Sequence, residues 1–239
     1  MMVENISYGR SSEAWQGHLD MLKLLITKYS LIRICEVGGG ANPAIPIEYI
    51  SEKNLDYTVL DISKDELEKA PAGYHKVNAD ICAMNFDIPA EYDLVFTKML
   101  AEHVKNGELM HKNIFKILSK GGIAFHFFPT LYTLPFLINR LAPERLSAYL
   151  LDLFAPRDQL RHKKFPAYYN WCRGPTRKQI EKFSNLGYEL VEYKGFFGHE
   201  EYYKKLLWVM NLSALISDYL VQYPVPQLTS YAYVILRKK

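Results

Sequence analysis

The chain has 239 residues, 49% of them hydrophobic, which excludes wholesale disorder and is enough for one large α/β domain. Its three cysteines, Cys35, Cys82 and Cys172, lie too far apart for a zinc cluster and are odd in number, so we expect neither a metal site nor a disulfide framework. The net charge is +3, and the sequence has neither a signal-peptide pattern nor a membrane-spanning stretch, so we expect a protein of the cytoplasm.

The predicted elements begin with a helix and then alternate between strands and helices. Apolar residues at helical spacing predict a helix over residues 11–29. Short apolar runs that end in turn residues predict five strands, with helices between most of them. This alternation indicates βαβ units and a parallel sheet. The predicted strands are 31–37, 57–61, 75–80, 92–97 and 123–128, and two of the predicted helices are 64–70 and 106–119.

The alternation breaks after residue 128. Residues 129–175 contain apolar helical material followed by basic and aromatic side chains, and they are too many for a simple connection. Long insertions in a compact domain are typically lids or substrate-binding elements. We therefore predict a single domain, residues 1–239, with two inserted segments of this kind, 129–175 and 195–229. The elements expected after the first insertion are a helix from Thr176 to Gly187, a strand at 188–193, a helix at 200–221 and a last strand at 231–236.

A glycine-rich turn closes the first predicted strand, and an acidic residue closes the second. Gly38, Gly39 and Gly40 follow Glu36 and allow the backbone to approach a ligand closely. Asp61 comes 25 residues after Glu36, near the roughly 20 residues expected in a nucleoside-binding βαβ unit, where a carboxylate accepts hydrogen bonds from ribose hydroxyls. The two signals together indicate an adenosine-containing ligand.

Proline at position 43 disfavours a dinucleotide as the adenosine-containing ligand. A dinucleotide-binding turn asks for a third glycine or alanine at this place, and Pro43 does not provide the close helix packing that such a residue allows.

The motifs resemble those of the class I S-adenosylmethionine-dependent methyltransferases, of the type 11 kind, over roughly residues 30–128. The resemblance implies a three-layer, Rossmann-like α/β fold with a seven-stranded sheet, mostly parallel with an antiparallel last strand, plus helical lid insertions. The matching stretches are Glu36-x-Gly-x-Gly-x-x-Pro43, Asp61, Ala79-Asp80-Ile81, Asp93-Leu-Val-Phe-Thr-Lys98 with Glu102-His103-Val104, and Leu118-Ser-Lys-Gly-Gly122.

The resemblance also implies S-adenosyl-L-methionine as the cofactor and gives each matching residue a role. Glu36 and the turn Gly38–Gly40 would border the methionine part, and Asp61 would bind the ribose. Ile62 would pack on the adenine, while Asp80 and Ile81 would flank its edge. Thr97 and Lys98 would lie beside the transferable methyl group, and Arg10 would pair with the cofactor carboxylate, unless it is a solvated surface arginine.

Methyl transfer from a sulfonium is an in-line displacement, so a general base is optional and serves mainly when the acceptor is a hydroxyl. His103 and His126 follow or lie in predicted strands and are the candidate catalytic bases. The alternatives are a helix-cap or core-edge role for His103 and a buried strand position for His126. No histidines or carboxylates have metal-ligand spacing, so we predict no metal.

Acceptor choice should depend on the insertions, which lie mainly in the basic part of the chain. Residues 1–130 have 13 Lys and Arg against 17 Asp and Glu, whereas residues 131–239 have 16 against 9. Aromatic and basic side chains there suit stacking on a sugar or planar acceptor and binding an anionic group, unless they only pack the insertion onto the core. The candidate substrate-binding residues are Tyr168, Tyr169, Trp171, Arg173, Tyr202 and Tyr203.

The apolar helices at 134–154 and 205–221 offer two other interpretations, a homodimer surface or contact with a membrane that carries a lipid-linked acceptor. Nucleic acid is not expected, because the basic residues form no run. The sequence thus predicts O-methylation of a small-molecule or glycan-like acceptor. The alternatives are a non-catalytic S-adenosylmethionine-binding partner subunit and an NAD-dependent oxidoreductase.

Overall fold

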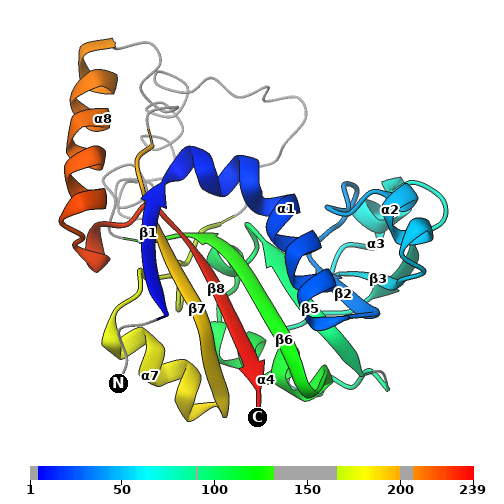
Figure 1. The fold of residues 1–239 in the computed structure, drawn as a ribbon. Coiled ribbons are helices and arrows are strands. Elements are labelled where there is room, and N and C mark those ends of the chain that lie inside the picture. The colour runs from blue at the N-terminus through cyan, green and yellow to red at the C-terminus, as the bar shows by residue number, and fades with distance from the viewer. Residues whose placement is uncertain (1–4, 90, 132–165, 200–206) are drawn as a thin grey trace.

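A single eight-stranded sheet runs through the computed structural model, which describes residues 5–89, 91–131, 166–199 and 207–239 (Figure 1). Its order is β1-β7-β8-β6-β5-β2-β3-β4, and β8 runs antiparallel to both of its neighbours, whereas the other neighbouring strands are parallel. The strands are β1 (Ile6–Arg10), β2 (Arg33–Val37), β3 (Asp56–Asp61), β4 (His75–Asn78), β5 (Tyr92–Lys98), β6 (Leu118–Pro129), β7 (Tyr188–Phe197) and β8 (Tyr231–Lys238).

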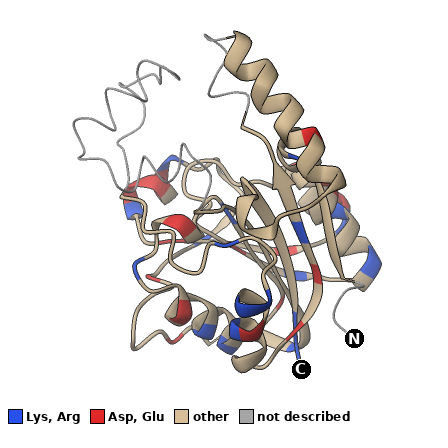
Figure 2. Cartoon of the chain, turned by 90° about the vertical axis from the view of Figure 1, so that its left-hand side faces the viewer, with Lys and Arg blue, Asp and Glu red and all other residues tan. Residues whose placement is uncertain are grey.

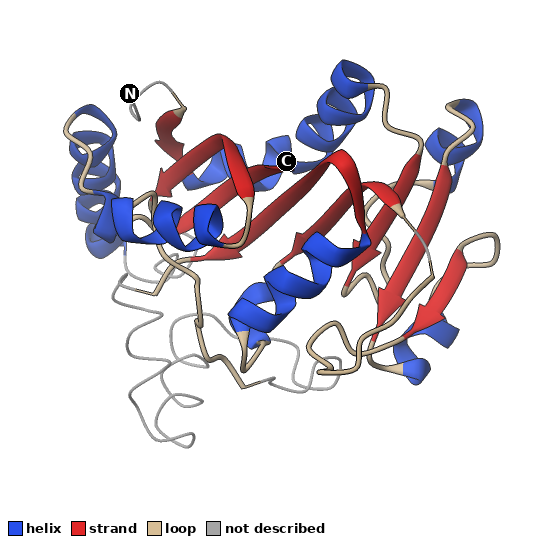
Figure 3. Ribbon diagram, turned by 90° about the horizontal axis from the view of Figure 1, so that it is seen from below, coloured by secondary structure: helices blue, strands red, loops and turns tan. Residues whose placement is uncertain are grey.

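Helices cover both faces of this sheet, which gives the three-layer α/β architecture expected of a Rossmann-like methyltransferase fold (Figure 3). The long helix α1 lies on one face, and α4 and α7 lie on the other (Figures 1 and 3). The helices are α1 (Ser11–Tyr29), α2 (Ile47–Glu52), α3 (Lys64–Lys69), α4 (Gly107–Ile117), α7 (Arg177–Asn185) and α8 (Leu207–Gln222), with the short 3₁₀ turns η1 (Ala101–His103) and η3 (Pro226–Leu228).

The central strand β6 shows how the sheet is buried on both sides. Phe125 and Phe127 point toward α1, where their rings lie 5.4 and 5.5 Å from the ring of His18. His126, between them, points to the opposite face and meets His111 of α4 at 4.7 Å between ring centroids. Side chains alternate across a strand, so a strand buried on both faces reads as a continuous apolar run, as β6 does.

The structure corrects the expected strand number from seven to eight. The additional strand is β1, which lies at the edge of the sheet as described and there pairs with β7 alone. Its residues are half-buried and mostly polar or small, so the segment has no strand-like apolar run. The other strands occur where they were predicted, and β6 and β7 are longer than expected. The predicted helical segments at 134–154 and the start of the predicted helix at 200–221 lie outside the described residues.

Candidate functional site

The glycine turn after β2 presses directly against the end of β3. Gly38 and Gly40 have φ angles of 82° and 46°, in the left-handed region that glycine adopts without a steric penalty. The Gly38 N–H donates to the carbonyl of Leu60 at 2.7 Å. A Cβ atom placed on Gly40 would lie 3.2 Å from Oδ2 of Asp61. The turn therefore brings backbone next to a carboxylate at the carboxyl edge of the sheet.

Asp61 is the half-buried acidic group of this arrangement. Its Oδ1 accepts a hydrogen bond from the Ser63 backbone N–H at 2.8 Å, which fixes the orientation of the carboxylate. Burial raises the pKa of Asp61 above its usual value. The next residue, Ile62, has a side chain that is 68% exposed. A half-buried hydrogen-bond acceptor beside an exposed apolar side chain fits a nucleoside, which offers hydroxyl donors and a flat apolar base.

Glu36 lies deeper than the turn that follows it, with 3% exposure. Its carboxylate accepts hydrogen bonds from the Ala44 backbone N–H at 2.9 Å and from the hydroxyl of Tyr57. Burial raises the pKa of Glu36 to about 7. In this position Glu36 holds residues 38–44 against β3, so it shapes the turn. Its predicted contact with the methionine part of a cofactor stays a prediction.

Asp80 and Ile81 follow β4 at the same edge of the sheet. Asp80 is exposed, and its Oδ1 accepts from the Cys82 backbone N–H at 2.7 Å. The Ile81 side chain is only 5% exposed and belongs to the hydrophobic core. Of this pair, therefore, Asp80 is the one whose side chain is accessible to a ligand.

The end of β5 contributes a cation and a strained backbone. Thr97 is fully buried and shares a 2.9 Å hydrogen bond with Nδ1 of His126. Lys98 is exposed, and within the described part of the chain no hydrogen bond or ion pair engages it. Thr97 pairs with Val37, the residue before the glycine turn, so the backbone of Lys98 leaves β5 beside this turn.

Met99, the next residue, has a φ angle of 54°, which is uncommon for a residue with a side chain. Strained positions of this kind cluster at functional sites. Neither the strain at Met99 nor the isolation of Lys98 is visible in the sequence, because both depend on how the chain leaves β5.

The two histidines expected as bases occupy different environments. His126 is completely buried, its Nε2 has no hydrogen-bond partner, and burial lowers its pKa to about 3. It therefore lies in the core, which was the alternative interpretation. His103 is partly exposed in η1, where its Nδ1 lies 2.9 Å from the Pro166 carbonyl and its Nε2 lies 3.6 Å from Oε1 of Glu102. Only His103 lies at the surface of the carboxyl edge.

Glu102, which the sequence matched only as part of a motif, is a buried carboxylic acid. It is 3% exposed, and its Oε2 has no hydrogen-bond partner. Burial raises its pKa to about 8, so the group is mostly neutral at neutral pH. Its backbone carbonyl accepts from the N–H groups of Tyr168 and Tyr169 at 2.7 and 3.0 Å. Glu102 thus lies at the attachment point of the segment that follows residue 165.

The aromatic segment 166–175 packs onto the core. Tyr169 is 3% exposed, and the Trp171 ring lies against His111 and Phe183 at 5.3 and 5.7 Å between centroids. The guanidinium of Arg173 donates to the Tyr169 carbonyl at 2.7 Å. These contacts favour the alternative interpretation, in which the segment holds the insertion in place. A role in acceptor binding stays a prediction for Tyr168, Tyr169, Trp171 and Arg173, and Tyr202 and Tyr203 lie outside the described residues.

Arg10 connects the N-terminal strand to α8. Its guanidinium donates to the Ala214 carbonyl at 2.8 Å and to Oδ1 of Asp218 at 2.6 Å. Its predicted pairing with a cofactor carboxylate therefore competes with these contacts. Within residues 5–89, 91–131, 166–199 and 207–239, no three His, Cys, Asp or Glu side chains gather as a metal site. No helix in those same ranges is long and apolar enough to cross a membrane.

Comparison with known proteins finds a family match over the part of the chain that contains the glycine turn and Asp61. Residues 36–126 match the family described as "Methyltransferase domain". No curated protein matches the chain. Solved structures share its fold. A SAM dependent methyltransferase from Archaeoglobus fulgidus is 15% identical, and the match covers 95% of this chain and 97% of that chain with a TM-score of 0.51. An S-adenosylmethionine-dependent methyltransferase from Clostridium acetobutylicum is 11% identical, and the match covers 94% of this chain and 92% of that chain with a TM-score of 0.55. The N-methyltransferase NodS from Bradyrhizobium japonicum, in complex with S-adenosyl-l-homocysteine, is 12% identical, and the match covers 94% of this chain and 86% of that chain with a TM-score of 0.52.

Proposed function

We propose that the chain is a class I S-adenosylmethionine-dependent methyltransferase, which transfers a methyl group to a small-molecule acceptor at the carboxyl edge of its sheet, because residues 36–126 match a methyltransferase-domain family and the fold is shared with such enzymes. The observation that carries this proposal is the contact between the glycine turn and Asp61, with Ile62 exposed beside it. Ligands of open α/β sheets bind outside the carboxyl ends of the strands, where this arrangement lies.

Four residues of this edge would hold the cofactor. Asp61 would accept hydrogen bonds from the ribose hydroxyls, and Ile62 would cover one face of the adenine. Asp80, exposed after β4, would contact the adenine edge. Lys98 would bind the methionine carboxylate, since it is exposed, follows the residue that pairs with Val37 before the glycine turn, and has no ion-pair partner among the described residues. When bound, S-adenosylmethionine supplies a methyl group that is already activated for displacement.

Lys98 is a better candidate for the carboxylate than Arg10. The Arg10 guanidinium already forms a charge-assisted hydrogen bond to Asp218, and a cofactor carboxylate would have to replace that contact. Lys98 would lose only water. In this proposal two carboxylates, Asp61 and Asp80, and one cation, Lys98, would position the cofactor.

We propose oxygen as the acceptor atom and His103 as the residue that takes its proton. His103 is partly exposed at the carboxyl edge, whereas His126 is enclosed in the core. A nitrogen acceptor, as the name of NodS states for that protein, needs no base if the amine is unprotonated, so loss of His103 would then leave turnover nearly unchanged. Of the predicted inserted segments, 195–229 is the one that we propose to contact the acceptor. Homodimer formation and membrane contact stay predictions.

Calorimetric titration tests the cofactor assignment. Wild type should bind S-adenosylhomocysteine, and Asp61→Asn should bind it about 10-fold to 100-fold more weakly, because a hydrogen bond to a charged group is worth about 1.5–3 kcal/mol. Asp93→Asn is a matched control, since Asp93 lies at the start of β5 and pairs with Arg33 at 2.8 Å. NAD bound more tightly than S-adenosylmethionine, or equal affinity in wild type and Asp61→Asn, would contradict the proposal. Release of S-adenosylhomocysteine with candidate acceptors then separates an enzyme from a silent binder.

A further inference from the structure

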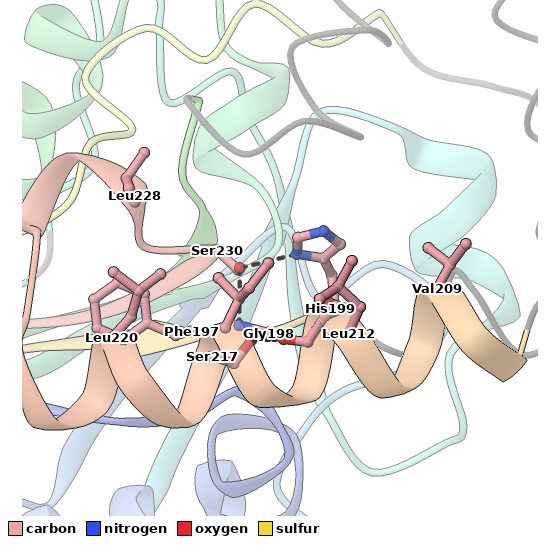
Figure 4. Close-up of a pocket in the computed structure, with 11 residues that line it drawn as sticks. Phe197, Gly198, His199, Val209, Leu212, Ser217, Leu220, Leu228 and Ser230 are labelled. Atoms are coloured by element: carbon pink, nitrogen blue, oxygen red, sulfur yellow. Dashed lines mark hydrogen bonds between the residues drawn. The ribbon is translucent and has the colours of Figure 1, made fainter.

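A pocket lies between α8 and the ends of β7 and β8 (Figure 4). We name it the α8 pocket. Because β8 is antiparallel to β6, the first residues of β8 lie at the carboxyl edge of the sheet, beside Pro129 at the end of β6. The last residues of β7 lie at this edge too, since Phe196 pairs with Tyr231. The α8 pocket therefore opens at the same edge as Lys98 and Asp61.

The walls of the α8 pocket are apolar and carry no charge among the residues that line it. Leu212, Ile216 and Leu220 form one wall, from successive turns of α8, and Phe197 and Leu228 contribute on the other side. Burying apolar surface is worth roughly 25 cal/mol per Å². Such walls favour a mainly apolar ligand over a sugar ring, whose many hydroxyl groups outnumber the few polar side chains that line the pocket.

Two polar side chains of the α8 pocket, Ser230 and His199, lie together opposite the middle of α8 (Figure 4). The Ser230 Oγ accepts from the Gly198 backbone N–H at 3.1 Å and lies 3.2 Å from Nδ1 of His199. Burial lowers the pKa of His199 to about 4, so this imidazole is neutral at neutral pH. This polar pair is thus uncharged and suits a hydroxyl or carbonyl group better than a carboxylate or phosphate.

Helix α8 is apolar on most of its surface, not only on the side that packs against the sheet. Between Leu207 and Gln222 its one charged residue is Asp218, and the helix is almost free of charge colours in Figure 2. Asp218 pairs with Arg10, away from the pocket wall formed by Leu212 and Ile216. The single charge therefore fixes the helix to the N-terminal strand and leaves the pocket side apolar.

The pocket volume limits the ligand. The α8 pocket is partly open and has a volume of about 230 Å³. A cavity of about 150 Å³ lined by aliphatic side chains and phenylalanine is large enough for benzene. The α8 pocket is larger and so accommodates one substituted ring or an aliphatic chain of similar volume.

The distance from the α8 pocket to the end of β5, where methyl transfer is proposed to occur, can be estimated from the strand order. β8 is the second strand from β5, with β6 between them. Neighbouring strands are about 4.8 Å apart, so the ends of β8 and β5 are separated by roughly 10 Å. Ser230, just before β8, is on the side of the pocket nearest to β5, so a ligand that extends roughly 10 Å from Ser230 reaches the end of β5 at Lys98.

We propose that the α8 pocket binds the apolar body of the methyl acceptor, a single substituted aromatic ring or an aliphatic chain of equal volume, and leaves its reactive end directed toward the end of β5. This inference rests on the proposed function and narrows its acceptor class from small molecules in general to apolar ones. A glycan-like acceptor is not part of it.

Binding of 4-propylphenol, followed by ligand-observed NMR and calorimetry, tests this inference. Ser213 lines the pocket, so Ser213→Trp should fill it and weaken 4-propylphenol binding at least tenfold. Asn211→Trp places the same side chain two residues away at an exposed position that does not line the pocket, and it should bind the probe as wild type does. Methyl glucoside should bind to none of the three proteins.

Several results would overturn the inference: no 4-propylphenol binding by wild type, equal binding by wild type and Ser213→Trp, equal loss in both tryptophan variants, or binding of methyl glucoside. Titration of S-adenosylhomocysteine on the same samples reports folding and the cofactor site separately. If wild type binds 4-propylphenol but not S-adenosylhomocysteine, the proposed function fails while the apolar pocket stands. If it binds only S-adenosylhomocysteine, the pocket assignment alone fails.

Discussion

Replacing Glu102 with glutamine should make the protein more stable in weakly alkaline solution. The carboxyl group is 3% exposed, its Oε2 has no partner, and its pKa is about 8 in the fold against an ordinary value of 4.5. The folded state therefore holds the proton more tightly than the unfolded state. Stability from this group is complete below the ordinary pKa and is lost as the pH rises toward the folded pKa.

The size of this effect follows from the two pKa values. Each pKa unit corresponds to about 1.4 kcal/mol, and most of the difference titrates between about pH 5 and about pH 8. Wild type should thus lose about 3 kcal/mol of unfolding free energy over that interval because of Glu102. Glu102→Gln has a neutral side chain of the same shape, so it should match wild type at about pH 5 and exceed it by about 3 kcal/mol at about pH 8.

Urea denaturation followed by circular dichroism at both pH values measures this difference. Glu189→Gln removes an exposed carboxylate of β7 and is the matched control, with the pH dependence of wild type. Parallel pH profiles for wild type and Glu102→Gln would refute the reasoning, because they would mean that Glu102 is solvated or paired in the folded protein.

Two further comparisons test the cofactor site. Lys98→Gln should weaken S-adenosylhomocysteine binding about tenfold while Arg10→Gln changes it less than about twofold, and calorimetry that shows the reverse order would return the carboxylate to Arg10. Gly40→Ala and Gly121→Ala both place a side chain at positive φ and should each cost about 1 kcal/mol of stability, but only Gly40→Ala should also weaken cofactor binding, since a Cβ there lies 3.2 Å from Asp61. Equal cofactor affinity in the two alanine variants would argue against the turn as a ligand site.

Periodicity was sufficient to predict most of the fold, because buried parallel strands such as β2, β3 and β5 are continuous apolar runs with clear ends. It failed for β1, whose half-buried residues lack such a run and whose strand character depends on pairing with β7. It also missed the short helix α2, which follows Pro46 and buries only Ile50.

The contact between Asp61 and the glycine turn could be predicted because strand ends determine where they meet, and their role in cofactor binding stays a prediction. The remaining site features depend on contacts between distant residues. Lys98 stands out because it lacks partners among the described residues, Glu102 because its carboxyl group is enclosed, and the α8 pocket because Phe197 and Leu228 meet α8. None of these relationships leaves a local pattern in the sequence.

The position of β8 has a consequence for how the protein is made. β8 is formed by residues late in the sequence, yet it lies between β6 and β7 and supplies backbone partners to both. On the ribosome, residues 231–238 must emerge before β7 and β1 can join the rest of the sheet. Until then the nascent chain exposes the open edge of β6, which is apolar and prone to pair with other chains. We therefore expect yield in cells to depend on chaperones that shield this edge during synthesis.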